Sequence, residues 1–64
     1  MTIPGLVVRV HGVNHEDVDV QFSDKIVTAK NMLKDLKVGE YVILNENLVI
    51  ERLSEHEAMK RMKQ

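Results

Sequence analysis

The stretch DVDVQF, residues 17–22, alternates strictly between polar and apolar side chains. Successive side chains of a β-strand point to opposite faces, so a period of two is typical of a half-buried strand. The pattern predicts that Val18, Val20 and Phe22 lie on the buried face, while the two aspartates and the glutamine lie in solvent.

Four further β-rich runs surround this strand. They lie at residues 6–10, 25–29, 41–44 and 48–53. Turns are predicted at residues 12–15, 23–24 and 45–47, because these segments are rich in Gly, Asn, Ser and Asp. Five short strands without alternating helices favour a small antiparallel sheet curled into a barrel. We therefore predict a mainly β fold, a five-stranded OB-like β-barrel with a short C-terminal α-helix.

The run at residues 6–10 follows a Pro-Gly pair and contains three valines, one leucine and one arginine. A regular strand would place alternate residues on one face. We expect Leu6, Val8 and Val10 to face the interior, and Val7 to face outward.

The C-terminal segment carries the signals of a helix start. Ser54 is a favourable N-cap, and Glu57 three residues later completes a capping-box pattern. Leu53 and Ala58 have the spacing of a hydrophobic staple. These signals predict a helix over about residues 55–62. The chain, residues 1–64, is then a single domain with its barrel in 1–53 and its helix in 54–64.

Two apolar groups outside the strands are expected to cover the barrel. Residues 31–37 are too short for a stable helix, so a loop or a single helical turn that packs Leu33 and Leu36 is expected. Met59 and Met62 form a modest apolar stripe on the helix. A thin core needs cover, so we expect this stripe to pack on the barrel rather than to face a partner.

Charge and composition favour a protein partner over nucleic acid. Nine Lys and Arg residues stand against ten Asp and Glu residues, and the chain has only two aromatic residues. Phosphate binding normally requires a basic excess, and single-strand binding requires stacking platforms. An OB-like nucleic-acid module remains the alternative, and its candidate contacts are Arg9, Lys25, Lys30 and Lys34.

No constellation of residues predicts catalysis or a resident cofactor. The chain has no cysteine, and the spacings around His11, His15 and His56 match no usual zinc-ligand pattern. The two serines lie at a turn and at a helix cap, without a base placed near them. We expect a non-enzymatic protein without metal or cofactor. No apolar run is long enough to span a bilayer and no signal-peptide pattern begins the chain, so a cytoplasmic location is expected.

Several segments, in order, resemble the HypC/HupF family of hydrogenase assembly chaperones. They are Ile3-Pro4-Gly5 before a Val-rich strand, VGEYVIL at 38–44, LVIERL at 48–53 and EHEA at 55–58. The resemblance implies an OB-fold-like barrel with a C-terminal helix that acts in [NiFe]-hydrogenase maturation. Such proteins carry iron with its cyanide and carbonyl ligands, and bind first a scaffold protein and then the hydrogenase large-subunit precursor.

The chain departs from the family pattern at two places. The family begins with Met-Cys shortly before Pro-Gly, and it carries a histidine in an H-x-G turn after the tyrosine strand; this chain has no cysteine, and its turn reads Asn45-Glu46-Asn47. Three explanations are open. The chain is a divergent member that keeps the protein-docking role, or the given sequence begins after the natural start, or the scaffold now has another use. The resemblance implies docking through the following residues: Met1, Thr2, Ile3, Pro4, Gly5 and Asn45.

Overall fold

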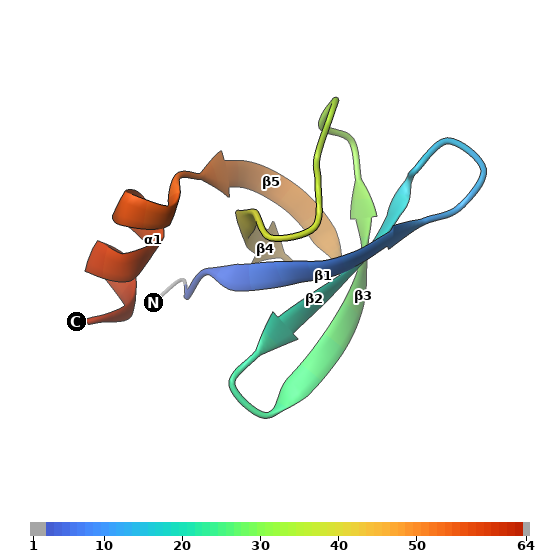
Figure 1. Ribbon diagram of the computed structural model, residues 1–64. Helices are drawn as coiled ribbons and strands as arrows, with labels where there is room; N and C mark the ends of the chain where they lie inside the picture. The colour runs from blue at the N-terminus through green and yellow to red at the C-terminus, as the bar shows by residue number, and fades with distance from the viewer. Residues whose placement is uncertain (1–2, 64) are drawn as a thin grey trace.

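The computed structural model describes residues 3–63 and contains five strands followed by one helix (Figure 1). The elements are β1 (Gly5–His11), β2 (Asp17–Phe22), β3 (Lys25–Asn31), β4 (Tyr41–Asn45), β5 (Leu48–Leu53) and α1 (Glu55–Met62). The strands close into a barrel in the order β1-β2-β3-β5-β4. The prediction of a mainly β, five-stranded barrel with a short C-terminal helix is confirmed.

The sequence predicts an antiparallel barrel, but the observed barrel contains one parallel pair of strands. β3 and β5 run parallel and pair at only two positions, Lys30 with Leu48 and Asn31 with Val49. The reason is the connection after β3, because residues 32–40 cross the end of the barrel before β4 begins. The β4–β5 hairpin then brings β5 back beside β3 in the same direction.

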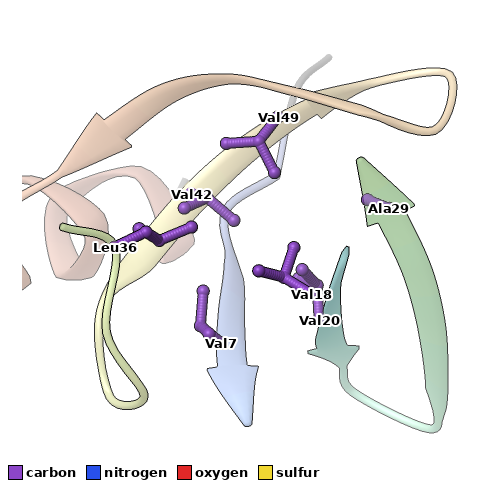
Figure 2. Packing of buried hydrophobic residues seen from close by; sticks show 7 residues of the cluster. All are labelled: Val7, Val18, Val20, Ala29, Leu36, Val42 and Val49. Carbon is purple, nitrogen blue, oxygen red and sulfur yellow. The ribbon is translucent and has the colours of Figure 1, made fainter. Parts of the chain in front are cut away.

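The barrel core consists mainly of valine side chains, and every strand contributes at least one buried residue. Its buried members are Val7, Val18, Val20, Ala29, Leu36, Val42 and Val49 (Figure 2). Phe22 and Leu33 are partly buried and pack against them. The alternation predicted for residues 17–22 and the packing predicted for Leu33 and Leu36 are therefore confirmed. Each fully buried valine contributes roughly 1.5–3 kcal/mol of transfer free energy relative to an exposed one.

The predicted facing of the first strand is wrong at Leu6, Val7 and Val8 and is confirmed at Val10. Val7 is fully buried, while Leu6 and Val8 are only partly buried. The register of β1 against β2 shifts between Val7 and Arg9, which marks a β-bulge. A bulge sets two residues opposite one and resets the alternation, so Val7 before it and Val10 after it both contact the core.

A second register shift lies in β4, between Ile43 and Leu44. Val42 belongs to the barrel core, and the adjacent Ile43 belongs to a second buried cluster with Leu53 and Ala58. Two consecutive residues of β4 are thus buried on opposite faces. The barrel core covers one face and helix α1 covers the other.

Helix α1 begins as predicted. The Ser54 hydroxyl accepts a hydrogen bond from the Glu57 backbone N–H at 3.1 Å. Leu53 and Ala58 are buried in the same cluster, as a hydrophobic staple requires. The expectation for Met59 and Met62 is wrong, because both side chains are exposed and neither joins the cluster. Ala58 is the buried residue of α1, so the helix contacts the barrel through a narrow stripe.

Candidate functional site

The N-terminal segment combines one exposed apolar residue with two buried ones. The Ile3 side chain is 60% exposed, whereas Pro4 and Gly5 are buried. A β-carbon built on Gly5 would lie 2.3 Å from Val20 Cγ1 and 2.8 Å from Phe22 Cζ. Gly5 therefore lets β1 enter the barrel directly against β2. Of the residues predicted to dock a partner, Pro4 and Gly5 are thus buried against the barrel, and Ile3 is exposed to solvent.

Met1 and Thr2, which the resemblance also assigned to docking, lie outside the described residues. Asn45 is exposed and lies at the end of β4, paired with Leu48 across a two-residue turn. The turn places the positive φ on Glu46, at 58°, rather than on either asparagine. An asparagine side chain both donates and accepts hydrogen bonds, so Asn45 suits polar recognition of a partner.

The pairing of β1 with β4 relates Ile3 to Asn45. Gly5 pairs with Val42, and this is the last recorded pair between the two strands. Because β1 and β4 are antiparallel, the chain before Gly5 and the chain after Val42 leave this pair in the same direction. Ile3 and Asn45 thus lie toward the same end of the β1–β4 seam, although they belong to different strands.

The outer face of β1, β2 and β3 carries paired charges. The His11 imidazole contacts Asp19, with His11 Nε2 at 3.1 Å from Asp19 Oδ1, and Thr28 Oγ1 donates to the same carboxylate oxygen at 2.8 Å. An ionised carboxylate can only accept, so His11 Nε2 carries the hydrogen of this bond. The hydrogen bond from His11, and then that from Thr28, hold the pKa of Asp19 below its ordinary value.

Two of the four basic residues considered for nucleic-acid contact, Arg9 and Lys30, lie beside carboxylates, whereas Lys25 and Lys34 are exposed. Lys30 Nζ donates to Asp17 Oδ1 at 2.7 Å, and this bond raises the pKa of Lys30. Arg9 lies directly across from Asp19 in the β1–β2 register. Carboxylates thus neutralise part of the positive charge on this face, which weakens the case for phosphate binding.

A groove of about 720 Å³ lies at one end of the barrel, between the loops at residues 12–16 and 32–38. Its lining includes Met32 and Val38, and both side chains are exposed. Asn31 joins the loops, because its amide nitrogen donates to the His15 carbonyl at 3.2 Å and its amide oxygen accepts from the Leu33 N–H at 2.9 Å. Sequence reasoning treated residues 12–15 as a turn and residues 31–37 as cover for the barrel, and no sequence signal marked Met32 or Val38 as exposed.

Among residues 3–63, no three His, Asp or Glu side chains are grouped so that they could hold a metal ion. Over the same range, no helix has the length and apolar character needed to cross a membrane.

Comparison with protein families identifies a match. The model of the HupF/HypC family matches residues 1–64, which is the whole chain. Among curated proteins, no match is found.

Proposed function

The chain belongs to the HupF/HypC family, and on this premise we propose that it is a non-enzymatic accessory chaperone that docks to a partner protein during [NiFe]-hydrogenase maturation. The observation that carries this proposal is the family match over the full length of the chain. The partners that the family resemblance implies are the maturation scaffold protein and the precursor of the hydrogenase large subunit.

The proposed docking surface comprises the N-terminal residues 1–5 and Asn45. Ile3 supports it, because an exposed isoleucine held next to two buried residues presents apolar area in a fixed position. A contact residue that is already ordered loses little conformational entropy on binding. Asn45 adds a polar group toward the same end of the β1–β4 seam.

In this role the chain docks to its partner but does not ligate iron at the positions that the family uses. The resemblance implies that iron is handled by an N-terminal cysteine and a turn histidine. The chain has no cysteine, and Asn45, Glu46 and Asn47 occupy the turn. Amide and carboxylate oxygens are hard ligands that suit Mg²⁺ or Ca²⁺ better than low-valent iron. The residues present therefore do not fit the family's mode of holding this cargo.

Co-purification from the native host tests the proposal. The tagged chain is expected to recover the large-subunit precursor, the maturation scaffold or both. Ile3→Asp is expected to reduce the recovery about ten-fold or more, because it places a charge in an apolar contact. Val13→Asp is the matched control, since Val13 is 90% exposed and lies in the β1–β2 loop, away from the proposed surface.

Two results would overturn the proposal. One is that the wild-type chain recovers neither protein. The other is that Ile3→Asp binds as the wild type does while Val13→Asp loses binding, because the contact would then lie at the groove end of the barrel.

A further inference from the structure

We infer that two copies of this chain pair through the open edge of β3, antiparallel and across a two-fold axis. β3 pairs with β2 along Lys25 to Lys30, but it pairs with β5 only through Lys30 and Asn31. Within the described part of the chain, residues 25–29 therefore have no strand on their second edge. In Figure 1, β3 lies on the right of the barrel and α1 lies on the left.

The hairpin geometry identifies the backbone groups that point to this open edge. In an antiparallel pair, hydrogen-bonded and non-hydrogen-bonded residue pairs alternate. The two-residue turn at 23–24 makes Lys25 a hydrogen-bonded position facing β2, so Ile26 and Thr28 point their N–H and C=O groups the other way. Two further bonds follow the same alternation: Lys30 N–H donates to Asn47 O at 2.8 Å on the far side, and Asn31 N–H donates to Glu16 O at 2.7 Å.

Natural edge strands are protected by charged residues, above all lysine, by proline, by a bulge or by a cover. On this edge the lysines lie only at the ends, at Lys25 and Lys30, and the central residues 26–28 carry no charge, proline or bulge. The β2–β3 register runs without a shift, whereas β1 and β4 both contain one. The exposed segment Ile26-Val27-Thr28 is entirely β-branched, and the Ile26 side chain is 60% exposed. β-Branched residues favour strand pairing.

A second copy of the chain fits this edge in one register. With Val27 on the two-fold axis, Ile26 lies opposite Thr28 of the second copy, and Thr28 lies opposite its Ile26. Ile26 and Thr28 both point their N–H and C=O groups away from β2, so the two Ile26–Thr28 pairs form four N–H···O=C hydrogen bonds. Lys25 then lies opposite Ala29 of the second copy, and no like charges face each other. The β-branched pairs match the cross-strand pairs that stabilise sheets.

Neighbouring registers would pair fewer of the free backbone N–H and C=O groups of β3. A shift by two residues in one direction sets Thr28 opposite Asp24 of the second copy, which lies in the turn. A shift in the other direction sets Ile26 opposite Lys30 of the second copy, whose N–H already bonds to Asn47. The Val27-centred register pairs residues 25–29 of each copy, which are the residues with a free second edge, and it ends before Lys30, which pairs with Leu48.

The axis residue lies beside a hollow that a second copy would cover. Val27 is partly buried and lines a cavity of about 320 Å³. The other lining residues are Phe22, Lys25, Leu44, Glu46 and Asn47. Pairing at β3 leaves Ile3 free but covers Glu46 and Asn47, which follow Asn45, and the dimer is tested on the purified chain without a hydrogenase partner.

Sedimentation equilibrium on the purified chain, over a concentration series, tests the inference. The wild type is expected to form a concentration-dependent dimer. Ile26→Pro removes an N–H that faces away from β2, a position where a sheet tolerates proline. It is expected to raise the dimer dissociation constant about ten-fold or more, because each copy loses one donor. Ile26→Thr keeps the N–H and the β-branch, and is expected to change the constant less than about three-fold.

Amide hydrogen exchange on the wild type gives a readout that does not depend on a variant folding. The amides of Ile26 and Thr28 are expected to be protected at high concentration and to lose protection on dilution. Those of Val27 and Ala29, which face β2, are expected to stay protected throughout. A chain that is monomeric at every concentration, or a dimer in which Ile26 and Thr28 exchange freely, would overturn the inference.

Discussion

Gly5 lies so close to Val20 that a β-carbon at position 5 would sit 2.3 Å from Val20 Cγ1. This contact joins the start of β1 to the core face of β2, and it fixes the direction in which the N-terminal segment leaves the barrel. Gly5, which the family resemblance assigns to docking, thus has a packing role as well. The segment before it can present Ile3 because Gly5 lets β1 lie this close to β2.

We predict that Gly5→Ala destabilises the fold by about 1–3 kcal/mol, because the added methyl group overlaps Val20 and Phe22. Urea unfolding followed by circular dichroism measures the change. Gly39→Ala is the control: position 39 has a φ of 97° but nothing within 4 Å, so strain alone should cost about 1–2 kcal/mol. Combining Gly5→Ala with Val20→Ala should cost less than the sum of the two single changes. Strict additivity would argue against the overlap.

The bulge in β1 predicts an asymmetry between two neighbouring valines. Val7→Ala should destabilise the barrel by about 2–3 kcal/mol, since the fully buried side chain would leave a cavity. Val8→Ala should cost about 1 kcal/mol or less, because Val8 is only partly buried. Equilibrium unfolding of both variants decides the point. A larger effect at Val8 would mean that β1 follows the regular alternation after all.

Removal of the helix cap should weaken α1. Ser54→Ala is expected to cost about 1 kcal/mol, because the Glu57 N–H loses its acceptor. Ser54→Asn retains a capping oxygen and should remain near the wild type. Backbone chemical shifts of residues 55–62 report helix content, and thermal unfolding reports stability. Equal stability of Ser54→Ala and the wild type would show that the cap contributes little beyond the packing of Ala58.

Asp19 predicts an acid-sensitive contribution to stability. The hydrogen bonds from His11 and Thr28 lower its pKa in the folded state below the ordinary value of 3.8. A group with a depressed folded pKa stabilises the fold above its unfolded pKa, and this stabilisation is lost as pH falls below 3.8 toward the folded value. Thr28→Val should reduce the loss, and Asp19→Asn should remove the part that Asp19 contributes. Urea midpoints between pH 2 and pH 6 test this, and an unchanged acid dependence in Asp19→Asn would contradict it.

The sequence was sufficient to predict elements whose signals are local. The alternation at residues 17–22 and the capping pattern at Ser54 depend on neighbours in the chain, and both predicted the observed structure. The family resemblance likewise rests on short segments in order, and the family match agrees with it.

The features that sequence reasoning missed depend on the partner strand. A bulge at Val7 to Arg9 exists only relative to β2, so a run of valines does not reveal where the alternation resets. The parallel seam of β3 and β5 follows from how residues 32–40 cross the barrel. The exposure of Met59 and Met62 depends on how much of α1 the barrel covers. Ala58 is the buried residue of α1, so the barrel covers only a narrow stripe of the helix. In the candidate site, the packing role of Gly5 required knowledge of which side chains lie beneath it.

An NMR titration can show whether a hydrogenase maturation partner docks through Ile3 and Asn45. The isotopically labelled chain is titrated with purified maturation scaffold, and separately with the purified large-subunit precursor. We predict saturable binding to at least one of them, with the amides of Ile3, Gly5 and Asn45 shifting and those of Val13 and Met32 unchanged. No binding to either protein, or shifts confined to the loops at residues 12–16 and 32–38, would contradict it.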